Sequence, residues 1–424
     1  MFDKILQIFK VKDIRNKILF ILFILVVFRL SANIPIPGVD PSQLKSFFEG
    51  NQLFGLLDMF SGGGLTNISI MMLGVGPYIT ASIIMQLMTM IFPQLEQMYK
   101  EEGEAGRQRF NMWTRWLTVP LAALQGFAMI SLLKSQGLMG AMNIFDYATI
   151  IITATAGTIF LMWLGELITE KGLGNGVSLI IFAGIVSSLP VTIKQLIATW
   201  DPTKVLVYAG FGAMSIVTIA AVVFITEGQR NIPVSFAKRI RGGSKAQGGG
   251  TSYLPLRVNQ AGVIPIIFAM SIMLFPGVIA NFFAGSSNDK IANLAGVVAD
   301  FFANQAIYAG FYFILVVLFT YFYTAVTFDP KNVSENLQRQ GSFIPGIRPG
   351  IPTMEYLNFI VNRITLTGAL FLGLVAILPF VVQGITGIQT LTIGGTGILI
   401  VVSVVIETIK QIEAQLVMRD YDRL

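Results

Sequence analysis

The sequence predicts an all-α integral membrane protein with ten transmembrane helices in two inverted halves of five helices each. Hydrophobic residues make up 54% of the 424 positions and charged residues only 12%. The apolar residues occur in long blocks, and nearly all Lys and Arg residues fall on one side of these blocks. A soluble domain carries about twice this charged fraction, so too few charges remain to cover a soluble core.

Ten segments are long and apolar enough to cross the bilayer, which requires roughly 20 mostly apolar residues. We expect the first to stay in the membrane, because its basic N-terminal flank leads into it and no small-residue cleavage site follows. The ten segments are 18–33, 68–92, 113–133, 146–168, 176–197, 205–226, 259–283, 306–328, 362–382 and 391–410.

The positive-inside rule orients these spans. Of the 29 Lys and Arg residues, 23 lie on the side of the N-terminus and 5 on the opposite side, and Arg29 lies inside the first span. We therefore expect both termini in the cytoplasm, which requires an even number of spans.

The spans divide into halves 1–196 and 197–424, joined by a short outer loop that contains Asp201 and Pro202. Halves with an odd number of spans, inserted in sequence, have opposite orientations. This arrangement is typical of an inverted repeat with a site at the interface. The repeat is inferred from the number of spans, because the two halves show no strong sequence similarity.

Missing residue types limit the chemistry. The chain has no Cys and no His, which excludes disulfides, Cys metal sites, imidazole ligands and the commonest general base. It also has no Gly-Lys dipeptide, which excludes a Walker A phosphate loop. We therefore expect no enzymatic activity, no cofactor and no bound metal, and we expect a partner or an ion gradient to supply any energy.

Two segments near the second span depart from a plain helical bundle. The outer segment 53–64 is apolar at first, is too short to span and ends in glycines, which predicts a re-entrant segment or a helix on the membrane surface. Gly74, Gly76 and Pro77 predict a broken or kinked second span. Irregular backbone at membrane depth is tolerated against protein or a water-filled cavity, so a structural kink and a cavity-lining role both remain open.

Two long loops, 227–257 and 329–356, lie on the side of the N-terminus, and loops of this length are usually functional or disordered. The tip of the first carries Lys238, Arg239, Arg241 and Lys245. These residues suit anionic lipid, RNA or an acidic protein face, or they only enforce the topology.

Eight motifs, spread over the chain from about residue 13 to the C-terminus, resemble the SecY family of bacterial protein-conducting channels. They are IPIPG (34–38), MFSGG (59–63), PYITASI (77–83), MWLGE (162–166), GLGNG (172–176), LPL (254–256), NQAGVIP (259–265) and FIPGIRPG (343–350).

The resemblance implies a central hourglass pore between the two halves. A ring of β-branched aliphatic side chains would form its constriction. Such a ring makes no hydrogen bonds to a passing peptide and seals by dewetting. Composition alone would make the same residues ordinary core. They are Val75 and Ile79 of the second span, Val177 and Ile181 of the fifth, Ile267 of the seventh and Ile400 of the tenth.

The resemblance also implies a plug and a lateral gate. The segment 53–64 would be the plug, with Leu53, Phe54, Leu56, Leu57, Met59 and Phe60 as its apolar residues. The gate would lie between the second and third spans and the seventh and eighth, with polar contacts from Thr80, Gln86 and Asn259. Each contact is worth ~0.6–1 kcal/mol in lipid, weak enough for an apolar signal sequence to compete. Asn259 alternatively caps the seventh helix.

The partners implied by the resemblance are the small membrane subunits SecE and SecG, the SecA motor ATPase, the ribosome, signal sequences, unfolded preproteins and membrane lipid, but not DNA. The location implied is the bacterial cytoplasmic membrane. Arg348 and the four basic residues of the first loop would form the docking surface for the motor or the ribosome. Contact with ribosomal RNA would be salt-dependent.

Two other functions compete with a channel. A secondary transporter with inverted repeats needs ionisable residues in mid-span, whereas Glu166 and Glu407 lie near span ends. An intramembrane protease needs a His base or paired mid-membrane Asp residues, and the sequence offers neither. A passive gated conduit, driven by an ATP-dependent motor or by translation, fits the sequence better.

Overall fold

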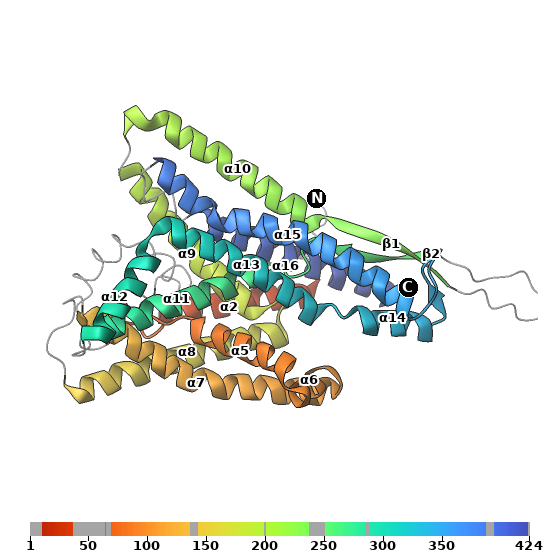
Figure 1. Ribbon diagram of the computed structural model, residues 1–424, viewed down its shortest axis with the longest axis horizontal. Coiled ribbons are helices and arrows are strands. Elements are labelled where there is room, and N and C mark those ends of the chain that lie inside the picture. The colour runs from red at the N-terminus through yellow and green to blue at the C-terminus, as the bar shows by residue number, and fades with distance from the viewer. Residues whose placement is uncertain are drawn as a thin grey trace, which may run out of the picture.

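The computed structural model describes residues 11–36, 64, 69–135, 143–198, 201–236, 251–284, 289–386 and 394–422. Long helices lie side by side in a bundle, and a β-hairpin extends from one end of it (Figure 1). The plug segment 53–63 and the loop tip 237–250 lie outside the described residues.

A helix occupies each of the ten segments expected to span the membrane. They are α2 (Lys12–Ser31), α5 (Gly76–Ile91), α7 (Gly103–Ser135), α8 (Ile144–Lys171), α9 (Gly176–Ala198), α10 (Val205–Glu227), α11 (Ile264–Ala284), α13 (Gln305–Thr327), α15 (Ile351–Thr386) and α16 (Gly394–Asp422). Four shorter elements were not expected. They are α6 (Pro93–Lys100), the 3-10 helix η1 (Pro202–Lys204), α12 (Asp289–Ala303) and α14 (Pro330–Arg339).

Among the described residues, four helical segments are long and apolar enough to cross a membrane: α8, α10, α13 with α14, and α15, with mean hydropathies of 1.7, 2.1, 1.9 and 2.3. The bent pair of α5 and α6 adds a fifth if it counts as one span. α2 fails this criterion because each of its 18-residue windows holds at least three charged residues. The structure is thus a helical membrane protein, and the total of ten spans stays a prediction.

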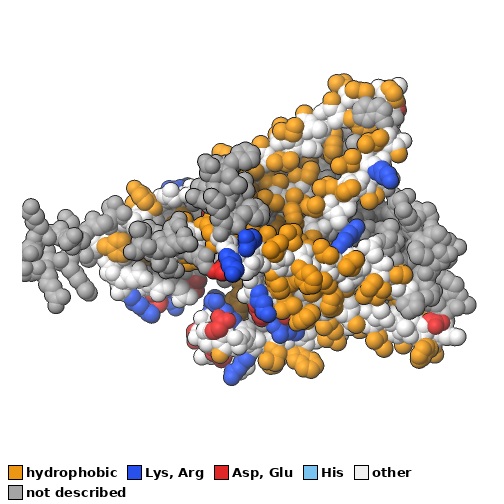
Figure 2. Space-filling model, turned by 180° about the vertical axis from the view of Figure 1, so that it is seen from behind, with side chains coloured by type: hydrophobic (Ala, Val, Ile, Leu, Met, Phe, Trp, Pro, Cys, Tyr) orange, Lys and Arg blue, Asp and Glu red, His pale blue; other side chains and the backbone are white. Residues whose placement is uncertain are grey.

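The outer surface of the bundle supports this conclusion. Large apolar side chains such as Trp116, Leu206 and Leu318 are 73%, 86% and 58% exposed. Figure 2 shows hydrophobic side chains spread over the bundle, with most charged side chains gathered toward the end that carries the hairpin. A continuous apolar surface of this size suits lipid rather than water.

The second expected span is broken, as its glycines and proline predicted. The chain turns through residues 70–74, where Gly74 has a φ of +57°. Helix α5 begins at Gly76, with Pro77 in its first turn, where the missing N–H leaves no hydrogen bond unmade. At Phe92 the chain bends by 110° into α6.

The described parts of the two long loops join in one three-stranded sheet. β1 (Gln229–Phe236) pairs antiparallel with β2 (Thr251–Arg257), and β3 (Ser342–Phe343) pairs with the other edge of β1. The sheet order is β2-β1-β3. Its inward side chains pack on the first turns of α15 in a separate apolar cluster of Ile232, Leu256, Ile344, Leu357, Ile360 and Val361.

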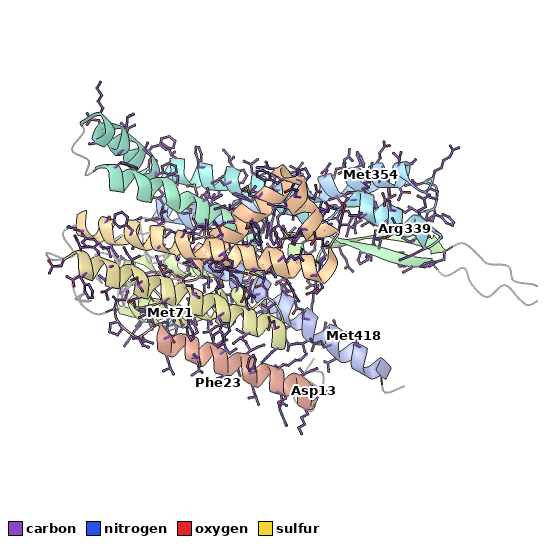
Figure 3. The ribbon with its side chains drawn as sticks, turned by 90° about the horizontal axis from the view of Figure 1, so that it is seen from below. Asp13, Phe23, Met71, Arg339, Met354 and Met418 are labelled. Carbon is purple, nitrogen blue, oxygen red and sulfur yellow. The ribbon has the colours of Figure 1, made fainter. Side chains whose placement is uncertain are left out.

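Two seams join the helices that precede η1 to those that follow it. At one seam α11 packs against α5 and α7, and at the other α16 packs against α9. Figure 3 places Asp13 of α2 and Met418 of α16 toward the hairpin end, with Arg339 of α14. The start of α2 and the end of α16 therefore lie at the same end of the bundle.

Candidate pore and lateral gate

Four of the five helices at the two seams are α5, α9, α11 and α16. The six residues expected at the constriction lie on or directly beside these four helices. Five are buried and belong to one hydrophobic cluster, and the sixth, Val177, is half-buried and packs against it. Val75 is the residue that precedes α5, so one of the six expected residues lies on the irregular backbone of the broken span. The exposed fractions of the five are 1% for Val75, 7% for Ile79, 1% for Ile181, 5% for Ile267 and 1% for Ile400.

The start of α9 places Val177 and Ile181. Asn175 Oδ1 accepts hydrogen bonds from the N–H groups of Val177 and Ser178, at 3.1 and 3.3 Å. The N–H of Gly176 donates to Thr169 Oγ1 of α8 at 2.9 Å. These side chains satisfy N–H groups that a helix N-terminus otherwise leaves unpaired.

Two glycines let α8 and α9 approach closely at this point. A Cβ on Gly176 would overlap the carbonyl oxygen of Gly165, and a Cβ on Gly165 would lie 3.1 Å from Val177 Cγ2. Sequence reasoning missed both roles, although both glycines fall inside motifs used for the family resemblance. The residue type alone does not reveal such a role, because helical glycines such as Gly310 meet no atom within 4 Å.

The irregular segment before α5 is held on two sides. The N–H of Ile70 donates to the carbonyl oxygen of Ile34 at 3.0 Å, beside a β-bridge between Pro35 and Ser69. On the other side, Gly157 of α8 brings its backbone against the carbonyl of Ile70, where a Cβ would overlap the oxygen. These contacts fix the approach of the chain to Val75.

Asn259 orders the segment that leads into α11. Its Nδ2 donates to the carbonyl oxygen of Gly262 at 3.1 Å, and Gly262 has a φ of +61°. Asn259 Oδ1 is buried and accepts no hydrogen bond from any described residue. The alternative in which Asn259 caps the seventh helix is therefore wrong.

The other two polar residues expected at the gate bond within their own helix. Thr80 Oγ1 donates to the carbonyl oxygen of Gly76 at 3.0 Å. Gln86 Nε2 donates to Ser82 Oγ at 3.3 Å, and within the described chain Gln86 Oε1 has no hydrogen-bond partner. The seam between α5, α7 and α11 is therefore held mainly by apolar packing.

A family model described as SecY matches residues 69–409, most of the chain. The chain belongs to the SecY family. Similar curated proteins include the protein translocase subunits SecY of Streptomyces galbus and Corynebacterium glutamicum. The first is 44% identical, covering 98% of this chain and 97% of that protein. The second is 41% identical, covering 99% of both.

Solved structures share the fold of this SecY-family chain. One is titled as the structure of a protein-conducting channel, with a TM-score of 0.63 at 19% identity. Another is Sec61 in the canine ribosome–channel complex from the endoplasmic reticulum, with a TM-score of 0.59 at 17% identity. Each comparison covers 94% of this chain and 91% of the other.

Arg348, expected at the docking surface of this SecY-family chain, lies exposed in the segment between β3 and α15. Its carbonyl oxygen accepts a hydrogen bond from Thr353 Oγ1 at 2.8 Å, and the carbonyl of Gly350 accepts one from Ser334 Oγ at 2.7 Å. Gly350 has a φ of +96°, a conformation that suits glycine. The other expected docking residues, Lys238, Arg239, Arg241 and Lys245, lie outside the described residues, as do Leu53, Phe54, Leu56, Leu57, Met59 and Phe60 of the plug.

Two ion pairs join charged groups of neighbouring helices. Glu166 Oε1 of α8 accepts a hydrogen bond from Arg115 Nε of α7 at 2.7 Å. Glu227 Oε1 of α10 lies 2.9 Å from Lys410 Nζ of α16. Pairing of this kind holds neighbouring helices together, and a transporter site would instead place ionisable groups at mid-span.

Proposed function

We propose that this chain forms the pore of a bacterial protein translocase and works as a gated, passive conduit for unfolded secretory proteins. Membership of the SecY family supports this function. The observation that supports it is that the six expected β-branched aliphatic residues lie on or beside four helices that pack at the seams between the two halves, with five of them buried in the main hydrophobic cluster and Val177 packed against it. A ring of this kind seals against water and ions by dewetting, and it deforms around varied side chains.

The lateral gate is the seam between α11 and the pair α5 and α7. Helices in lipid are not held together by the hydrophobic effect, because acyl chains are as apolar as the side chains that they replace. A signal sequence that enters this seam therefore exchanges one apolar contact for another. The halves then part, the plug segment 53–64 moves, and the polypeptide passes the ring. Apolar segments leave sideways into the lipid.

The sheet couples a docked partner to the gate. β2 ends at Arg257, and the N–H of Val258 donates to the carbonyl oxygen of Gly228 at 2.9 Å. Asn259, at the gate, comes next in the chain. A motor or ribosome that binds the basic tip and Arg348 would therefore dock beside a sheet whose strand β2 leads into α11.

The finer assignments belong to the same proposal. The ten spans form inverted halves 1–196 and 197–424 around an hourglass pore, with both termini in the cytoplasm. SecE and SecG accompany the chain in the cytoplasmic membrane, and SecA or the ribosome docks at the hairpin end. Solved relatives in the comparison include Sec61 and Ssh1 complexes bound to ribosomes, which supports the ribosome as a partner.

Reconstitution with SecA, ATP and a secretory precursor tests the function. We expect protease-protected precursor to accumulate inside proteoliposomes that contain the chain. The Arg348→Glu variant should reduce the rate strongly. Arg339→Glu is the matched control, because Arg339 is a 75% exposed arginine of the same loop that is paired with Glu335. No protected precursor with the unaltered chain would contradict the function, and equal rates for the two variants would contradict the role of Arg348.

A further inference from the structure

The short helix α12 has several large apolar side chains on the outside. It joins α11 to α13 at the end of the bundle opposite the hairpin, and it is steeply inclined to them in Figure 1. On its inner side Ala295 is only 8% exposed and Phe302 packs against the main hydrophobic cluster. Leu294 and Val297 are 69% and 68% exposed, and Phe301 is 41% exposed.

The exposed residues of α12 form one continuous stripe. Residues at positions i, i+4, i+7 and i+11 lie on one face of a helix, and Lys290, Leu294, Val297 and Phe301 have this spacing. Val298, which is 39% exposed, widens the stripe. In a connector surrounded by water, the large apolar residues would face the core and the small or polar ones would face outward. The exposed Leu294, Val297 and Phe301 therefore indicate an apolar environment around the outer face.

The stripe is continuous with the apolar face of α13. The ring centroids of Phe301 and Phe311 are 6.0 Å apart in an edge-to-face arrangement. From Phe311 the exposed face of α13 continues through Ile314 and Leu318, which are 54% and 58% exposed. α13 belongs to a segment apolar enough to cross the membrane, so this face is a lipid-facing surface. The outer face of α12 extends the same surface around the end of the bundle.

We propose that α12 is an interfacial helix whose occupant is lipid of the outer leaflet. Leu294, Val297, Val298 and Phe301 contact the acyl chains. Lys290, exposed at the start of the same stripe, lies at the level of the lipid phosphates, where a long cationic side chain can reach the interface. The contact with lipid depends only on the membrane location of the bundle. Its consequence, that outer-leaflet lipid influences the gate through α11, rests on the proposed function.

Single spin labels test this proposal directly, because the chain has no cysteine. Labels are attached to L294C, V297C and F301C in the full chain, which is reconstituted in vesicles of phosphatidylethanolamine and phosphatidylglycerol. Collision with oxygen, which concentrates in lipid, is compared with collision with a water-soluble nickel chelate. Two matched controls calibrate the scale: Leu318 of α13 for lipid, and Tyr253 of the hairpin, which is 63% exposed, for water.

We expect the oxygen-to-nickel ratio at the three α12 positions to match that at Leu318 and to exceed that at Tyr253 several-fold. A ratio like that at Tyr253 would place the helix in water and overturn the proposal. Immobile labels with low collision rates for both reagents would show that a protein partner covers the face, which would also overturn it. If the label at Leu318 collides mainly with oxygen while the α12 labels do not, this proposal fails but the membrane location of the bundle stands. If the label at Leu318 also collides mainly with nickel, the membrane location itself fails.

Discussion

Gly176, the first residue of α9, has no room for a side chain. In a Gly176→Ala variant, the new Cβ would overlap the carbonyl oxygen of Gly165 and would also lie 2.8 Å from Ile168 Cβ. Close-packed interiors leave no room for such an overlap. The oxygen is a backbone atom that cannot rotate away, so α8 and α9 have to separate. Overpacking of this kind costs about 1–3 kcal/mol. We expect the upper part of this range, together with a displaced Val177 and Ile181.

Two measurements follow the effect of Gly176→Ala. Denaturant unfolding in mild detergent should show the loss of stability, and proteoliposomes that contain the variant should leak ions because the ring no longer closes. The matched control is Gly310→Ala in α13, where a Cβ would meet no atom within 4 Å. This control should be neutral or more stable by up to about 1 kcal/mol. If Gly176→Ala is as stable and as tight as Gly310→Ala, the close contact between α8 and α9 does not position the ring.

Three further substitutions probe single contacts. Gly157→Ala would place a Cβ on the carbonyl oxygen of Ile70, so denaturant unfolding should show a loss of about 1–3 kcal/mol. Tyr312→Phe removes a buried hydroxyl that lacks a hydrogen-bond partner in the described chain. In thermal unfolding the variant should be as stable as the unaltered chain, or more stable by up to about 1 kcal/mol. A clear loss of stability would mean that the hydroxyl is hydrogen-bonded. Arg115→Ala breaks the ion pair with Glu166, in which the arginine side chain is 46% exposed. The variant should lose about 1 kcal/mol, and the loss should shrink in high salt.

The helices were predictable because the hydrocarbon core imposes a length that apolar blocks reveal directly. Their ends were less predictable. α15 begins at Ile351 rather than at 362 and α7 begins at Gly103 rather than at 113. Hydropathy marks only the part of a helix inside the membrane. The first turns of α15 instead cover the sheet through Leu357 and Ile360, a contact that hydropathy does not report.

The sheet and α12 escaped prediction for a different reason. Ile232 and Val234 alternate with exposed residues in β1, and this period-2 pattern is typical of a half-buried strand. Their partner strands, however, lie in other parts of the chain, and β3 has only two residues. α12 was counted as an outer loop because it is too short to span, although its stripe of Leu294, Val297 and Phe301 has helical spacing.

The assignment of six residues to a pore ring rests on the family resemblance and stays a prediction. Composition alone made Ile181 and Ile400 ordinary core residues, and the structure buries both to 1% exposure. Burial does not distinguish a pore constriction from a core. The six residues lie on or beside four helices that pack at the two seams, and no local pattern in the sequence contains this arrangement.

Cross-linking of a translocating polypeptide tests the central claim most directly. Single cysteines at Ile79, Ile181, Ile267 and Ile400 are compared with one at Val217, which is 66% exposed on α10. A secretory precursor that carries a cross-linker is stalled part-way during translocation. We expect cross-links to the four ring positions and none to Val217. Cross-links to none of the four, or equally strong ones to Val217, would contradict the claim that the polypeptide passes between the two halves.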